Sequence, residues 1–223
     1  MNTRLDHLVV AARTLDDGVA WCEAVLGITP GPGGRHPLMG THNRLFGIAS
    51  VAFPQTYFEI IAIDPHARTP ARARWFGLDA APVQAVPCLL HFVARTADIR
   101  AACAVLAALG EDCGIPSAAS RATPQGELQW QISVREDGRL PHGGALPTLI
   151  EWGVSHPTDD LPASGVTLAA LSVQAAEPGL LSAAYAALSL SDVTVQQDAG
   201  ALVPRLCASL NTPRGRVVLQ SAG

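Results

Sequence analysis

The sequence predicts an α+β protein built from tandem βαβββ modules, two of them forming a curved sheet around a cavity and a third, shorter one following. Strand-like alternation and helix-like spacing of apolar residues recur in the same order along the 223 residues. The segment Arg-Thr-Leu-Asp at 13–16 is echoed by Arg-Thr-Ala-Asp at 95–98, each directly after a strand-like run. A composition of 48% hydrophobic and 15% charged residues supports a globular chain with a buried core.

The first module is predicted over residues 1–63. Apolar alternation indicates a strand over 4–12, and Thr14 then stands three residues before Asp17, a spacing typical of a helix N-cap. Apolar residues recur at helical spacing up to Gly27, which is expected to end the helix. Strands near 41–49 and 56–63 complete the module. Residues 64–85, rich in Ala, Arg and Pro, are interpreted as the crossover to the second module.

The second module is predicted over 86–155 and follows the same order. A strand over 86–94 precedes a helix over about 97–109, which Gly110 ends, and strands near 126–135 and 147–153 follow. The polar, glycine-rich segment 137–144 is expected to be a loop. Residues 156–164 are interpreted as a linker in which His156 faces solvent. The third module, over 165–223, is expected to contain a strand, a helix from Pro178 to Leu188, and further strands near 193–197, 205–211 and 215–221.

Composition excludes several classes of partner. The net charge of −4 and the scattered Lys and Arg residues argue against nucleic acid or an anionic membrane. No apolar stretch reaches the ~20 residues that cross a bilayer, and the first six residues show no long apolar signal core. The five cysteines are an odd number without a Cys-x-x-Cys pair, which is typical of reduced thiols. We therefore expect a cytoplasmic protein whose partner is a small molecule.

Four ionisable residues lie inside strand-like apolar runs: His7, Glu59, His91 and Glu151. Each histidine falls on the first strand of its module and each glutamate on the last. A carboxylate in such surroundings is strongly penalised unless a cation or hydrogen-bond donors compensate it. One divalent metal shared by all four is the simplest hypothesis, and the mixed N/O set suits Zn, Ni, Co, Mn or Fe. In the competing interpretation each glutamate accepts a buried hydrogen bond or pairs with an arginine, without a metal.

Three segments carry a resemblance to a known family. They are Leu5-Asp6-His7-Leu8-Val9, with its helix ending at Gly27; Tyr57-Phe58-Glu59-Ile60-Ile61; and the run from Gly33 to Asn43. The chain resembles the vicinal oxygen chelate superfamily of glyoxalases, bleomycin-resistance proteins and dioxygenases, and within it the glyoxalase-like domain branch. The resemblance covers about residues 4–155. It implies paired βαβββ modules around a metal or ligand cavity, with glyoxalase I ligand positions mapping to His7, Glu59, His91 and Glu151.

The resemblance also implies a function. A metal-dependent isomerase, lyase or dioxygenase would chelate a small oxygenated molecule, and Glu59 or Glu151 would act as general base. The candidates for substrate contact are His36, His42, Arg44, Tyr57 and Trp152. The alternative is a metal-free protein of the bleomycin-resistance type that sequesters a small, partly apolar ligand. Pairing of the first two modules is expected, while pairing with the third module, or across a homodimer, stays open.

Overall fold

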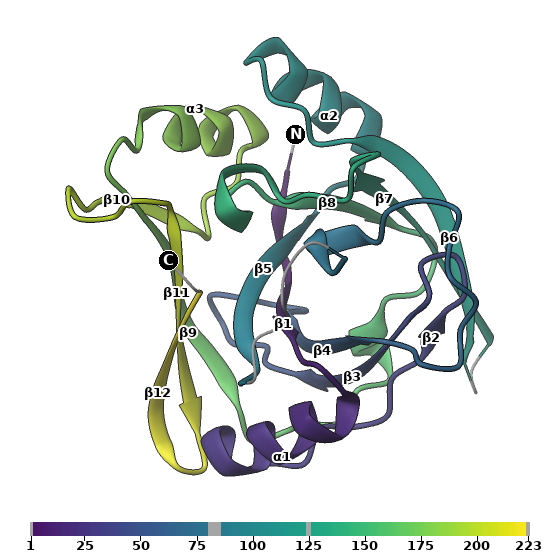
Figure 1. Ribbon diagram of the computed structural model, residues 1–223. Coiled ribbons are helices and arrows are strands. Elements are labelled where there is room, and N and C mark those ends of the chain that lie inside the picture. The colour runs from purple at the N-terminus through teal and green to yellow at the C-terminus, as the bar shows by residue number, and fades with distance from the viewer. Residues whose placement is uncertain (1, 80–85, 124–125, 222–223) are drawn as a thin grey trace.

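The computed structural model describes residues 2–79, 86–123 and 126–221, so the predicted crossover is described only up to residue 79. It consists of an eight-stranded sheet that curves into a nearly closed form and a separate four-stranded sheet (Figure 1). The strands of the large sheet are β1 (Arg4–Ala11), β2 (Arg35–His36), β3 (Thr41–Gly47), β4 (Tyr57–Ile63), β5 (Cys88–Arg95), β6 (Ile115–Thr123), β7 (Gly126–Val134) and β8 (Thr148–Trp152). The fold confirms the predicted α+β class.

The strand order of the large sheet is β2-β3-β4-β1-β5-β8-β7-β6. Strand β1 pairs with β4 in parallel and with β5 antiparallel, and β5 pairs with β8 in parallel. The first and last strands of both modules are therefore the four central strands of one sheet. This confirms the expected pairing of the first two modules.

Strand β6 was not predicted. Its sequence is mostly small and polar, and its positions alternate only between exposed and half-buried, so it carries no apolar pattern. It forms a long antiparallel ladder with β7. Strands β6 and β2 are the two ends of the sheet order, and they contact each other where the sheet closes on itself. We call this junction the seam.

The helices begin and end where local chemistry dictates. The Asp17 amide donates to Thr14 Oγ1 (3.1 Å) at the start of α1 (Leu15–Leu26), and Gly27 ends the helix with φ 75°. Asp98 caps α2 (Ile99–Ala108) by accepting from the Ala101 amide (2.9 Å). None of the helices in the described residues combines the length and apolar character that a bilayer crossing requires.

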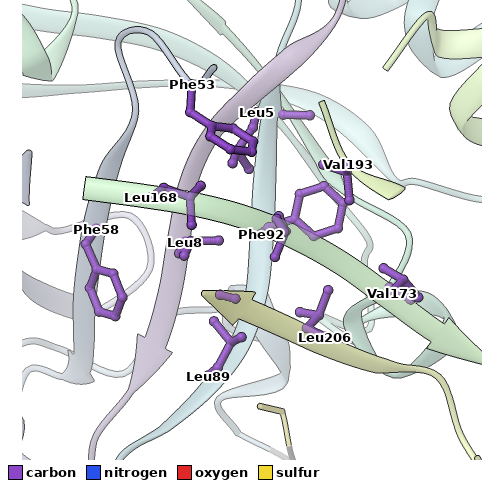
Figure 2. Packing of buried hydrophobic residues seen from close by; sticks show 14 of the residues in the cluster. Leu5, Leu8, Phe53, Phe58, Leu89, Phe92, Leu168, Val173, Val193 and Leu206 are labelled. Atoms are coloured by element: carbon purple, nitrogen blue, oxygen red, sulfur yellow. The ribbon is translucent and has the colours of Figure 1, made fainter. Parts of the chain in front are cut away.

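The two faces of the large sheet have different surroundings. Its outer face packs against the helices and the third module, and we call this cluster the outer core. The third module contains β9 (Thr167–Ala175), α3 (Gly179–Leu188), β10 (Thr194–Gln197), β11 (Arg205–Thr212) and β12 (Gly215–Gln220). Figure 2 shows Leu168, Val173 and Leu206 of this module packed beside Leu8 and Phe92 of the large sheet. The third module therefore covers the back of the cavity-forming strands.

The inner face of the sheet carries a second apolar cluster, the inner core, which includes Val9, Ile61 and Val93. The strand alternation predicts that Leu5 and His7 share one face. The structure instead places Leu5 in the outer core, because the register between β1 and β5 shifts between Leu5 and His7. The irregularity falls on Asp6 and lets its carboxylate lie beside the ring of its own neighbour, His7.

Candidate functional site

A small cavity lies on the inner face of the large sheet. Its free volume is about 30 Å³, enough for one or two water molecules. Trp75, Phe76, Trp130 and Trp152 are among the side chains of its wall. Its polar lining comes from His7, His36, Asn43, Glu59 and Arg121. A few polar groups in an aromatic wall are typical of a small-molecule site.

The register of two adjacent strands, β1 and β4, brings His7 and Glu59 together. His7 of β1 pairs with Tyr57 of β4, and Val9 pairs with Glu59, so His7 and Glu59 face the same side two positions apart. The distance from His7 Nε2 to Glu59 Oε2 is 3.5 Å. The ring of Tyr57 stacks on the His7 ring, with centroids 4.4 Å apart. Both His7 and Glu59 are almost fully buried, at 3% and 5% exposure.

Asp6 holds the other side of the His7 ring. Its Oδ1 lies 2.6 Å from His7 Nδ1, while its Oδ2 accepts from Trp152 Nε1 (3.0 Å) and lies 3.0 Å from His156 Nε2. Arg95 Nη1 lies 3.9 Å from the same Oδ2 atom. His156 was expected to face solvent, but its ring instead bonds to this buried carboxylate. The Asp6 side chain is completely buried and is compensated by these donors.

The contacts set the charges of the three groups. Burial alone would lower the pKa of His7, but hydrogen bonds to Asp6 and Glu59 and their negative charges raise it to about 9. Burial would raise the pKa of Glu59, but the hydrogen bond and charge of His7 hold it below its usual range. For Asp6, hydrogen bonds from His156 and His7 likewise outweigh burial and lower the pKa. At neutral pH the site therefore contains an imidazolium between two carboxylates.

This arrangement gives the stability of the fold a defined pH dependence. The pKa of His7 rises on folding from 6.5 to about 9, so the folded state binds this proton more tightly. The resulting stabilisation is complete below pH 6.5 and is lost as the pH rises through 9. We expect the free energy of unfolding, measured in urea, to fall by about 3 kcal/mol across this window, since one pKa unit corresponds to about 1.4 kcal/mol. His7→Gln should remove this fall, and an equal fall in that variant would contradict the assignment.

Asn43 fixes the second oxygen of Glu59. Its Nδ2 donates to Glu59 Oε1 (2.6 Å), and its Oδ1 accepts from the Gly34 amide (2.7 Å), which sets the orientation of the amide group. A Cβ atom on Gly33 would lie 2.1 Å from the Asn43 carbonyl oxygen, so the close approach of this segment requires glycine. His36 lies beside Asn43, and burial lowers its pKa to about 4, which keeps the ring neutral.

A larger outer pocket of about 310 Å³ adjoins the inner cavity. The two share Leu45, Arg121 and Pro157 as lining residues. Glycines 33 and 126 and the linker residues His156 and Asp160 form other parts of the outer wall. A pocket of this volume is large enough for a small organic molecule. The inner cavity can therefore receive the end of a ligand whose remainder occupies the outer pocket.

His91 lies on the same inner face as His7, but both of its ring nitrogens are occupied by other groups. The Thr148 amide donates to Nε2 (3.0 Å), so Nδ1 carries the proton and donates to the Gly144 carbonyl oxygen (2.8 Å). Burial lowers the pKa of His91 to about 3, and the ring is neutral. His91 therefore links its own strand, β5, by hydrogen bonds to β8 and to the segment before β8.

We expect His91→Ala to destabilise the fold without changing the charges at the cavity. The change leaves the Thr148 amide and the Gly144 carbonyl without their partner, at a cost of about 1–3 kcal/mol for each buried group. Urea unfolding measures this loss, and NMR titration of His7 provides the matched readout. A shift of the His7 pKa as large as the one caused by Glu59→Gln would contradict this separation.

Three other predicted site residues point away from the cavity. Ile150 and Trp152 line the cavity, so Glu151, which lies between them, faces the opposite side. Its Oε2 accepts from the Ile99 amide (2.8 Å) at the N-terminus of α2. His42 and Arg44 alternate with Asn43 and Leu45 on β3 and therefore face outward too. Of the predicted substrate contacts, His36, Tyr57 and Trp152 line the cavity.

The four predicted metal ligands do not converge. His7 and Glu59 are together, whereas His91 and Glu151 bond to separate backbone groups. In the part of the chain that the structure describes, no group of three or more His, Cys, Asp and Glu side chains is arranged to hold a metal ion. The residues present therefore do not fit the four-ligand site that the resemblance implies.

Comparison with known proteins identifies the family. A family model described as "Glyoxalase-like domain" matches residues 5–189. The chain belongs to the glyoxalase-like domain family. The match spans both modules and reaches the end of α3, and it confirms the resemblance to the vicinal oxygen chelate superfamily. A search of the curated proteins finds no match.

The chain is similar to solved structures of other proteins, one of which matches over almost its whole length. A hypothetical protein from Staphylococcus aureus is 15% identical, with a TM-score of 0.62 over 99% of this chain and 86% of that chain. Methylmalonyl-CoA epimerase from Mycobacterium tuberculosis is 14% identical, with a TM-score of 0.39 over 70% of this chain and 90% of that one. A Streptomyces coelicolor methylmalonyl-CoA epimerase in complex with 2-nitronate-propionyl-CoA is 15% identical, with a TM-score of 0.42 over 68% and 97%.

Four residues of the site were not found by sequence reasoning: Asp6, Asn43, Arg121 and His156. Asp6 lies next to His7, where strand alternation would direct its side chain to the opposite face. Asn43 had a signal, since alternation on β3 places it on the same face as Leu45. Arg121 lies on the strand that carried no apolar pattern. His156 comes from a linker, whose path no periodicity describes.

Proposed function

We propose that this protein is an enzyme that removes a proton from the carbon next to a carbonyl group of a small molecule. Glu59 is the base, and His7 donates a hydrogen bond to the carbonyl oxygen. The observation that carries the proposal is the ionised Glu59 beside the protonated His7 in an otherwise largely apolar cavity wall. Both the isomerase and the lyase classes use this step.

The charges suit this chemistry. The Glu59 carboxylate takes the proton, the C–H bonding electrons form the carbon–carbon double bond of an enolate, and negative charge develops on the carbonyl oxygen. The protonated His7 ring carries a proton on each nitrogen. Nδ1 donates to Asp6, so the Nε2 proton is the donor for that oxygen. The 3.5 Å separation of Nε2 and Oε2 exceeds the range of a tight hydrogen bond. Both groups therefore retain capacity for a substrate.

Hydrogen–deuterium exchange tests the proposal without knowledge of the full reaction. The protein is incubated in D2O with acetaldehyde, hydroxyacetone, pyruvate or 4-oxopentanoate, and NMR follows the signals of the protons next to each carbonyl. We expect at least one compound to lose these signals faster than in protein-free solution. Exchange no faster than in buffer for all of these carbonyl classes would count against the proposal.

A second candidate is a non-catalytic protein that sequesters a small, partly apolar ligand, as proteins of the bleomycin-resistance type do. The aromatic wall formed by Trp75, Phe76, Trp130 and Trp152 favours it. Ligand binding that quenches tryptophan fluorescence, without accelerated proton exchange, would support this candidate. Metal analysis covers the divalent-metal hypothesis: one bound metal per chain, lost in both His7→Ala and Glu59→Gln, would assign the pair to metal binding instead.

A further inference from the structure

Arg121 lies where the two pockets meet. It pairs with Leu128 across the β6–β7 ladder, and Leu128 belongs to the inner core, so Arg121 faces inward as well. It is among the residues shared by the inner cavity and the outer pocket. Any ligand that spans both spaces passes beside its guanidinium group.

The guanidinium of Arg121 lies against Gly34 across the seam. A Cβ atom on Gly34 would stand 2.3 Å from Arg121 Nη1 and 3.1 Å from its Cζ. Gly34 is not among the glycines with positive φ, so its backbone conformation is open to other residues. The absence of a side chain at Gly34 therefore makes room for the arginine and is not a requirement of a turn.

The charge of Arg121 is unpaired within the part of the chain that the structure describes. In the described residues no carboxylate forms an ion pair with it, whereas Arg74, Arg95 and Arg135 each contact one. Glu127, which also lines the outer pocket, bonds to Ser120 and Gln129 instead. An arginine at a pocket junction without a carboxylate partner is suited to bind an anion from outside the chain.

We propose that Arg121 binds an anionic oxygen group of the ligand, a carboxylate or a phosphate, in the outer pocket. In terms of the proposed function, the substrate is then an anionic carbonyl compound whose reactive end reaches Glu59 and His7. The planar guanidinium matches both kinds of oxygen group with two parallel hydrogen bonds. Anion binding by Arg121 is measurable without a reaction, so only the identification of the ligand as a substrate rests on the proposed function.

Matched probes test the subsite in the full chain. The probes are 4-oxopentanoate, its uncharged methyl ester and inorganic phosphate, and binding is followed by tryptophan fluorescence because Trp130 and Trp152 line the inner cavity. We expect the wild type to bind the acid at least about tenfold more tightly than the ester. Phosphate competes for the same site: tighter binding of phosphate than of the acid assigns the subsite to phosphate esters, and the reverse assigns it to carboxylic acids.

Two variants remove the interaction in different ways. Arg121→Gln deletes the charge and should reduce the preference for the acid over the ester to about onefold. Gly34→Ala keeps Arg121 but displaces its guanidinium, and it should weaken acid binding in the same direction. Gly179→Ala is the matched control, because a Cβ atom there meets nothing within 4 Å. Thermal unfolding of each variant verifies that it is folded.

The outcomes separate this inference from the proposed function. Anion binding that depends on Arg121, in a protein without proton exchange, supports the subsite and removes the enzymatic proposal. Equal affinity of the wild type for acid and ester overturns the subsite, as does an unchanged preference in Arg121→Gln. Failure of the wild type to bind any of the three probes overturns it as well.

Discussion

Glu59→Gln should reduce the rate of proton exchange by about 10²–10⁴-fold, the range for loss of a general base. The amide has nearly the same shape as the carboxylate and can still accept the hydrogen bond from Asn43, but it cannot take a proton from carbon. The pKa of His7 should fall in the same variant, because one of the two carboxylates that raise it is gone. NMR measures both quantities on one sample.

Glu151→Gln is the matched control for this change. It alters the same residue type on the last strand of the other module, but its side chain faces the N-terminus of α2. We expect an unchanged exchange rate and a loss of about 0.3–1 kcal/mol in stability, since a charge at a helix N-terminus is removed. Comparable losses of exchange in both variants would show that the effect is structural and would contradict a catalytic role for Glu59.

Asp6→Asn should reduce the free energy of unfolding by about 3–5 kcal/mol, which is the range for removing one partner of a buried ion pair. Asp6 is completely buried and compensates His7 while accepting from Trp152 and binding His156. The variant leaves the imidazolium with Glu59 alone and turns one acceptor into a donor. Urea unfolding gives the free energy, and the pKa of His7 should fall in parallel.

Asp17→Asn provides the comparison for Asp6. Its ion pair with Arg13 is exposed, with side-chain exposures of 36% and 67%, so its removal should cost far less stability than removal of the buried Asp6 carboxylate. A loss for Asp6→Asn no larger than the loss for Asp17→Asn would show that the buried network adds nothing to the stability of the fold.

Most of the fold was predictable because its signals are local. The capping pair Thr14 and Asp17, the helix-ending Gly27 and the alternation in β1, β4 and β5 specify their elements within short windows of sequence. Strand β6 could not be found this way, because it forms by pairing with β7 and carries no apolar alternation of its own. Its small and polar residues fit a strand at the end of the sheet.

Only the part of the site that comes from the first module was predictable from the sequence. The pairing of His7 with Glu59 followed from their places on the first and last strands of one module, which lie side by side in the sheet. The same pattern in the second module required Glu151 to face the cavity. A shift of one residue along a strand reverses the face of every side chain, and in β8 Ile150 and Trp152 face the cavity while Glu151 faces outward. His91 faces inward, and its nitrogens bond to the Gly144 carbonyl and the Thr148 amide, groups that only the folded chain brings near.

The seam between β2 and β6 is relevant to how a ligand enters the inner cavity, which has a free volume of only about 30 Å³. Strand β2 has only two residues, and the hydrogen-bonded order of the sheet ends at β2 on one side and at β6 on the other. Separation of β2 from β6 therefore breaks no hydrogen bonds of a β-ladder, whereas separation of any two neighbouring strands in the sheet order does. Opening of the sheet therefore costs the fewest hydrogen bonds along the seam, where the Arg121 guanidinium lies against Gly34.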